Sequence, residues 1–189
     1  ATGLDLWGGP QMQLLDQPML AHALDLPPDR IRLHMSYVGG SFGRRAQPHA
    51  QAHIEAALLA KALGDGRPLK VIWTREDDMA SAQSYYHPAY AVRIDAGLDE
   101  KGKIAAWRHR VAGQSVLATT PVAPMLRGGP DFFIFEGGPD QPYALPRIRV
   151  EATAVELPVL ASWLRTSGTL QNAFAVESMI DAVARDAGI

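Results

Sequence analysis

Three glycines, two aromatic residues and two arginines stand close together in the segment SYVGGSFGRR, residues 36–45. Glycine leaves the backbone bare, so a ligand can approach it closely, and neighbouring arginines suit an anion. The spacing GGSFG matches neither the GxGxxG pattern of dinucleotide-binding loops nor the GxxxxGK(S/T) pattern of a P-loop. From the residues alone two interpretations stay open: a ligand-binding loop, or a tight turn that needs positive φ.

A second candidate is the segment WLRTSGTLQNAF, which begins at residue 163. It places Arg165 and Gln171 in a loop rich in Ser, Thr and Gly, just before the last predicted helix. Backbone amides at a helix N-terminus bind anions readily. A capped helix entrance without a ligand is the other interpretation of the same residues.

Other residue types that carry chemistry are sparse or badly spaced. His49 and His53 can share one face of a predicted helix, but Ala50 stands where the HExxH pattern of a metalloprotease needs glutamate. We therefore expect two solvated histidines and no metal site there. The chain has no cysteine, which excludes disulfides, thiolate nucleophiles and cysteine ligands for iron–sulfur clusters within it.

The elements that must position these residues follow from hydrophobic periodicity and turn residues. The glycine loop lies between a predicted strand at 30–37 and a predicted helix at 47–64, with Pro48 in its first turn and Gly64 just past its end. The other predicted elements are a helix at 17–26, strands at 68–74 and 147–157, and a hairpin at 90–113. A capping box of Thr74 and Asp77 is predicted to open a helical turn at 75–81. The final predicted helix has a buried stripe from Val176 to Ala187. The long stretch 119–146 is rich in proline and glycine and is predicted to be irregular.

Length and composition are those of a globular domain. The 189 residues, 47% of them hydrophobic, suit one domain or two small ones, and we predict a single domain over 1–189. Because strands and helices alternate irregularly and include a hairpin, the predicted class is α+β, with a mixed, largely antiparallel sheet packed with about three helices. The net charge of −2 argues against a general nucleic-acid binder, and no apolar run approaches the length of about 18 residues that a membrane span needs.

Three separated motifs together point to a family. WGGPQ at 7–11 is similar to a W-x-x-(S/T)-Q segment, VGGSFGRR at 38–45 to GGGFGRR, and WLRTSGTLQNAFAVES at 163–178 to W-R-S-V-G-x-x-x-N-A-F-x-x-E-S. In this order and spacing they resemble the molybdenum-binding subunit of the xanthine dehydrogenase and aldehyde oxidase family. The branch most similar is the beta subunit of isoquinoline 1-oxidoreductase.

The resemblance implies roles for particular residues. Gln11 corresponds to the glutamine that hydrogen-bonds the apical oxo ligand of molybdenum, and Arg165 to an arginine that stabilises charge on the substrate, so these two are the implied catalytic residues. The implied cofactor-binding residues are Gly39, Gly40, Ser41, Phe42, Gly43, Arg44 and Gln171. The implied cofactor is a molybdopterin, in its cytosine dinucleotide form, with molybdenum.

The resemblance also implies an enzyme, a molybdenum-dependent oxidoreductase that oxidises aldehydes or N-heteroaromatic compounds with water as the oxygen donor. Ala46 stands where xanthine-type relatives have a substrate-recognising glutamate, which disfavours a purine substrate. The implied partners are a 2Fe–2S small subunit, which the lack of cysteine here requires, and an electron-transfer subunit. Relatives occur in the bacterial cytoplasm and in the periplasm, so the resemblance leaves the compartment open.

Departures from the family pattern shape what we expect of the chain itself. The family's catalytic glutamate lies in a V-G-E motif that does not occur here, so we expect a fragment of a larger subunit, without cofactor or activity on its own. The alternative function is a non-catalytic interaction domain with a degenerate cofactor-binding fold, which Pro10, Ser41 and Ala46 favour. A nucleotide-binding module is a third possibility.

Overall fold

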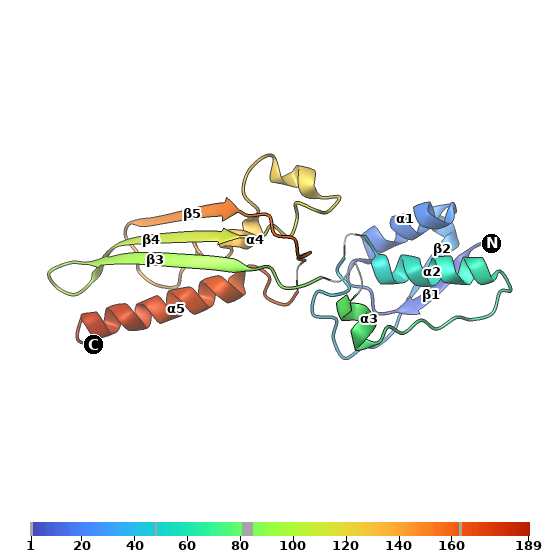
Figure 1. Ribbon diagram of the computed structural model, residues 1–189, viewed down its shortest axis with the longest axis horizontal. Coiled ribbons are helices and arrows are strands. Elements are labelled where there is room, and N and C mark those ends of the chain that lie inside the picture. Colours follow the sequence, from blue (N-terminus) through green and yellow to red (C-terminus); the bar gives the residue numbers. More distant parts are fainter. Residues whose placement is uncertain (1, 48, 81–84, 163) are drawn as a thin grey trace. The chain divides into compact units, whose positions relative to one another are not determined.

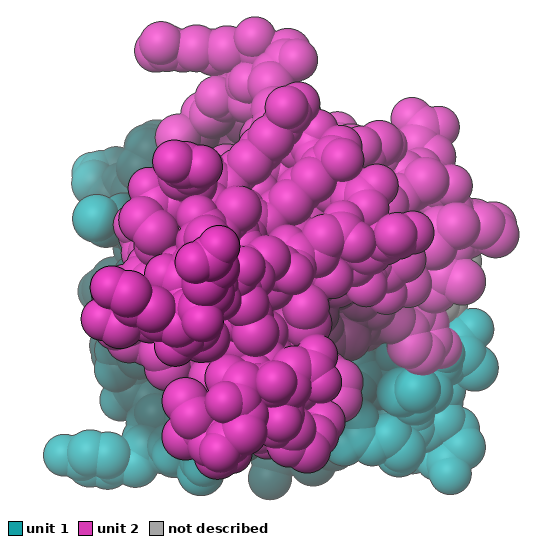
Figure 2. Space-filling model, turned by 90° about the vertical axis from the view of Figure 1, so that its left-hand side faces the viewer, with its two compact units in different colours: residues 1–84, 163–165 teal, residues 85–162, 166–189 magenta. Residues whose placement is uncertain are grey.

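The computed structural model describes residues 2–47, 49–80, 85–162 and 164–189 (Figure 1). They form two compact units, one from residues 1–84 and 163–165 and the other from residues 85–162 and 166–189 (Figure 2). Each unit has its own sheet and its own buried side chains, so each is described by itself.

The first unit is built on two parallel strands joined by a helix. β1 (Leu4–Gly8) pairs with β2 (Ile31–Met35), and α1 (Gln13–Leu24) with the short 3-10 helix η1 (Pro28–Arg30) forms the crossover between them. α2 (Gln51–Leu63) packs against α1. The buried core consists of Leu20, Ala21, Leu24, Ile31 and Ala57. Because the strands are parallel, the segments that follow β1 and β2 leave the same edge of the sheet.

Most elements predicted for this unit are confirmed. The predicted strand at 30–37 is β2. The predicted helix at 47–64 is α2, which is followed by Gly64 in the left-handed conformation (φ 68°) as predicted, but it begins only at Gln51, so His49 lies outside it. The predicted position of Pro48 lies outside the described residues. The helix predicted at 17–26 is α1, but it begins earlier, at Gln13.

The predicted strand at 68–74 is wrong, because this stretch is described and forms neither a strand nor a helix. Residues that favour strands make one only where a neighbouring strand completes the hydrogen bonds. The capping box beside it is confirmed: the N–H of Thr74 donates to Oδ2 of Asp77 (3.0 Å), and the N–H of Asp77 donates to Oγ1 of Thr74 (3.1 Å). It opens the short helix α3 (Arg75–Ala80).

The second unit is a three-stranded sheet with a long helix along one face (Figure 1). β3 (Tyr90–Leu98) and β4 (Ile104–Gly113) form the predicted hairpin, and β5 (Ile148–Ala154), the predicted strand at 147–157, pairs with β4 in parallel. The final predicted helix is α5 (Thr169–Asp186), which packs on β3. The largest apolar side chains of the core are Trp107, Val111, Val116, Ile134 and Val176.

The predicted α+β class and the mixed sheet are confirmed, with three long helices as expected. Fewer strand pairs are antiparallel than the sequence predicts, since β1–β2 and β4–β5 are both parallel. Parallel pairing needs a long crossover, and the connections after β1 and β4 are long enough to provide it. The stretch 119–146 contains only the short helices η2 (Ala123–Leu126) and α4 (Phe132–Phe135). Of the described helices, none combines the length and the hydropathy needed to cross a membrane.

Candidate functional site

Gln11 is joined to the glycine loop through its side-chain amide. Its Oε1 atom accepts hydrogen bonds from the backbone N–H groups of Gly43 (3.2 Å) and Arg45 (3.3 Å). The N–H of Gln11 itself donates to the carbonyl oxygen of Arg45 (3.4 Å). Because a backbone N–H can only donate, these bonds decide which end of the amide faces the loop. Gln11 is exposed, so its Nε2 group can donate to an oxygen of a ligand.

The glycine loop runs through an unusual backbone conformation. Gly40 (φ 126°), Phe42 (φ 52°) and Gly43 (φ 88°) all have positive φ. A Cβ atom at Gly40 would lie 2.9 Å from the Phe42 ring, so only glycine fits there. Phe42 is a strained position for a residue with a side chain, and 59% of it is exposed. Strain of this kind collects at functional sites, which favours the ligand-binding interpretation over a simple turn.

The end of β1 is held against the same loop. The hydroxyl of Ser41 donates to the carbonyl oxygen of Gly9 (3.4 Å), and Nη1 of Arg45 donates to that hydroxyl (3.5 Å). A Cβ atom on Gly9 would lie 2.7 Å from the side chain of Val38. Gly9 is therefore needed for the segment before Gln11 to approach the loop this closely.

Arg165 reaches the loop through its backbone. Its N–H donates to the carbonyl oxygen of Phe42 at 2.8 Å, so the structure brings two predicted site residues from distant parts of the sequence together. Both Arg165 and Phe42 are exposed. Gln11, Arg165 and the loop thus converge within the first unit.

Arg44 has a structural partner. Its Nε and Nη2 atoms lie 3.1 and 3.0 Å from Oδ1 of Asp78, and its guanidinium lies 5.4 Å from the centre of the Trp73 ring. Both stabilise a cation, one by charge and one by the ring face. Arg44 therefore ties the loop to α3.

Gln171 lies in the first turn of α5, in the second unit, so its predicted position in the loop before this helix is wrong; the glycine loop belongs to the first unit. Both polar atoms of its side-chain amide are buried and have no hydrogen-bond partner among the described residues. A buried amide left in this way costs stability unless some other group completes its hydrogen bonds.

The sequence did not predict a buried ionisable pair below the site. Asp16 on α1 is fully buried, and its Oδ2 lies 3.6 Å from Nδ1 of His53 on α2. Burial raises the pKa of Asp16 to about 6. Burial, and next the charge of Arg45, lower the pKa of His53. The expectation that His53 is solvated is wrong, since only 12% of its side chain is exposed.

A signal for this pair was present in the sequence. Asp16 precedes Leu20 and Leu24 at intervals of four, so it continues the apolar stripe of α1 and must be buried with it. Among the described residues no group of three or more His, Cys, Asp or Glu side chains is placed to hold a metal ion.

The arrangement defines a class of site: a bare, strained backbone loop with an amide donor fixed beside it, suited to a large cofactor rather than to a metal held by side chains. Residues 1–189 match the family of molybdopterin cofactor-binding domains, and the chain belongs to that family. This confirms the family predicted from the three sequence motifs.

Individual relatives agree with this assignment. The chain is 34% identical to the beta subunit of isoquinoline 1-oxidoreductase from Brevundimonas diminuta, over 96% of this chain and 22% of the relative. It is 33% identical to a membrane-bound aldehyde dehydrogenase (pyrroloquinoline-quinone) from Gluconacetobacter polyoxogenes, over 95% of this chain and 23% of that relative. Its fold resembles that of quinoline 2-oxidoreductase from Pseudomonas putida 86, with a TM-score of 0.77 and 23% identity over 99% of this chain and 23% of that one. The chain spans less than a quarter of the length of these relatives.

The residues present fit a molybdopterin cofactor. Apart from Gly39 and its two chain neighbours, no described heavy atom lies within 4 Å of the place where a Cβ of Gly39 would stand, so the backbone there borders open space that a bulky group can fill. Gln11 offers a fixed amide donor next to that backbone.

Proposed function

We propose that this chain forms part of the large subunit of a molybdenum hydroxylase, which oxidises aldehydes or N-heteroaromatic compounds with water as the oxygen donor. The observation that carries the proposal is the attachment of Gln11 to the glycine loop, through the N–H groups of Gly43 and Arg45. The family assignment and the names of the relatives support it, because those names include an isoquinoline oxidoreductase and an aldehyde dehydrogenase.

Each predicted site residue has a part in this proposal. When bound, the molybdenum cofactor supplies the two-electron oxidation chemistry. The loop residues Gly39, Gly40, Ser41, Phe42, Gly43 and Arg44 would hold it by bare backbone and shape, and the Nε2 donors of Gln11 would donate hydrogen bonds to an oxygen of the bound group. Arg165 places a positive charge beside Phe42, where it can stabilise negative charge that develops on the substrate. Gln171 is proposed as a further cofactor-binding residue.

The finer features of the proposal concern the cofactor form and the partners. We propose the cytosine dinucleotide form of molybdopterin, and a 2Fe–2S subunit that receives the electrons, with an electron-transfer subunit beyond it. The lack of cysteine supports a separate iron–sulfur chain, because this chain has no thiolate to ligate a cluster. The isolated chain of 189 residues is proposed to be inactive.

The experiment that tests the function is the variant Gln11→Glu in the full-length complex. Glutamate keeps an oxygen that accepts from the Gly43 and Arg45 amides but removes the Nε2 donors, so the loop is retained while the proposed role is lost. We expect molybdenum content to stay near that of the parent and turnover of an aldehyde or N-heteroaromatic substrate to fall about a hundredfold.

Two controls accompany this variant. Gln11→Ala removes both the oxygen that accepts from the loop amides and the Nε2 donors, so molybdenum content should fall along with turnover. Elemental analysis of the parent complex measures the metal directly. A parent complex without molybdenum, or unchanged turnover in Gln11→Glu, would contradict the proposed function and favour a non-catalytic domain.

A further inference from the structure

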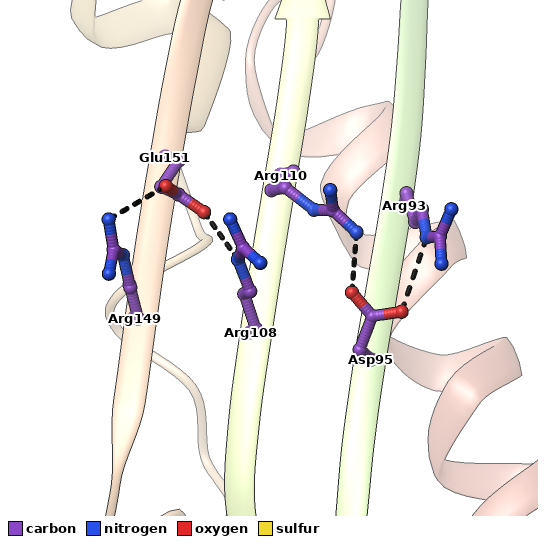
Figure 3. Close-up of polar contacts among 6 residues, drawn as sticks. All are labelled: Arg93, Asp95, Arg108, Arg110, Arg149 and Glu151. Atoms are coloured by element: carbon purple, nitrogen blue, oxygen red, sulfur yellow. Dashed lines mark hydrogen bonds and ion pairs between the residues drawn. The ribbon is translucent and has the colours of Figure 1, made fainter.

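The sheet of the second unit has one face packed with α5 and one face lined by charged side chains (Figure 3). Side chains alternate along β4: Trp107, His109 and Val111 are buried, while Arg108 and Arg110 between them lie on the opposite face. The strand registers place further charged residues of β3 and β5 beside these two arginines. We call this surface the charged sheet face, made of Arg93, Asp95, Arg108, Arg110, Arg149 and Glu151.

Each carboxylate on the charged sheet face is shared by two arginines, with N···O distances between 2.6 and 3.2 Å. The pairs are Arg93 and Arg110 with Asp95, and Arg108 and Arg149 with Glu151. A guanidinium has five N–H donors, so one bond to a carboxylate leaves most of them for other acceptors. Nε of Arg110 is buried and has no hydrogen-bond partner within the described part of the chain.

Positive charge is concentrated on this face, although the second unit as a whole has a net negative charge. The second unit contains nine Lys and Arg residues and eleven Asp and Glu residues. Four of the nine basic residues lie on the charged sheet face, but only two of the eleven acidic ones do. The face therefore carries a net charge of +2 in a unit that is otherwise strongly acidic.

The face also has room for a side chain from outside. A shallow hollow of about 340 Å³ lies over the small residues Ala91, Ala112 and Thr153, and the charged side chains beside them are Arg93, Arg110 and Glu151. A carboxylate that enters this hollow can accept from both guanidiniums, the pairing that arginine makes best.

We propose that the charged sheet face binds the acidic surface of a separate protein chain. Asp95 and Glu151 stand among the arginines and would repel a phosphate backbone, whereas a protein surface can match both signs with carboxylates and amines in register. Interfaces that are buried permanently are apolar and poor in charged residues, so this face suits a partner that associates and dissociates. The inference concerns docking and does not depend on the proposed reaction.

The test uses the full-length protein, purified at low salt with the chains that accompany it. Arg93→Lys and Arg110→Lys each keep the positive charge and introduce a primary amine, which a carbodiimide couples to a carboxylate in direct contact. We expect mass spectrometry to find these amines coupled to Asp or Glu of another polypeptide. The coupling should fall at least about tenfold between about 50 and 500 mM NaCl, because salt screens such contacts. The matched control is Arg185→Lys, which is exposed on α5 and should give no such product.

A second measurement uses the partner that the coupling identifies. In the double variant Arg93→Gln/Arg110→Gln the dissociation constant for that partner should rise about tenfold, while Arg185→Gln leaves it unchanged. Coupling only to Asp95, to Glu151 or to the same polypeptide, or no coupling at all, would overturn the proposal. A labelled DNA oligonucleotide that binds the parent protein and not the double variant would also overturn it, in favour of a nucleic acid.

Discussion

Replacing Asp16 by asparagine is expected to stabilise the protein at alkaline pH, although it removes a charge that lies near His53. Burial raises the pKa of Asp16 from its ordinary value of 3.8 to about 6, so folding opposes the ionised form. An acid with a raised pKa binds its proton more tightly in the folded state, and stability therefore falls as pH rises from about 4 to about 6 and stays reduced above that range. A shift of this size corresponds to about 3 kcal/mol of the free energy of unfolding at pH 8.

The assay is urea unfolding of the parent and of Asp16→Asn at pH 8, 6 and 4, followed by tryptophan fluorescence. We expect the variant to be more stable by up to about 3 kcal/mol at pH 8, and the advantage to vanish near pH 4, where the parent carboxyl is protonated. The buried amide that replaces it needs partners of its own, which makes this figure an upper bound. Asp29→Asn, at an exposed position of η1, is the control.

The titration of His53 changes stability in the opposite direction with pH, so its contribution must be measured separately from that of Asp16. Burial lowers the pKa of His53, so its contribution to stability is lost as pH falls below the pKa of an unfolded histidine. Repeating the comparison in a His53→Gln background removes this contribution. If parent and variant show the same dependence of stability on pH in both backgrounds, the account of Asp16 as a buried, destabilising carboxylate is refuted.

Three further changes test the packing around the site and the sheet. Gly40→Ala forces a Cβ against the Phe42 ring at a φ of 126°, so it should destabilise the loop by about 1–3 kcal/mol and lower the molybdenum content of the full-length protein, measured by elemental analysis. Gly113→Ala drives a Cβ into the Tyr90 ring and should lower the midpoint of thermal unfolding by several degrees, whereas an unchanged midpoint would show that the ring moves aside freely. Thr74→Ala removes one half of the capping box and should cost about 1 kcal/mol in urea unfolding, and Thr74→Ser should restore most of it.

Interactions within a few residues of one another could be predicted from the sequence. The capping box of Thr74 and Asp77, the end of α2 at Gly64 and the hairpin of β3 and β4 are all confirmed. Each depends on a side chain or a turn close in the chain, so the residues involved are visible in a short window of sequence. The three motifs identified the family for a related reason, because each is a short run of residues.

Contacts between distant segments depended on the tertiary structure. The stretch 68–74 has the composition of a strand but does not form one, and β5 pairs in parallel because a long crossover returns it beside β4. Arg165 meets Phe42 through a backbone hydrogen bond, which no side-chain pattern encodes. The contact of Asp16 with His53 arises only where α1 packs on α2, and that packing sets their pKa values. The sequence by itself thus determined the family, the local elements and the glycine loop. The fold decided which of these segments contact one another and how burial shifts the pKa values of the groups that they bring together.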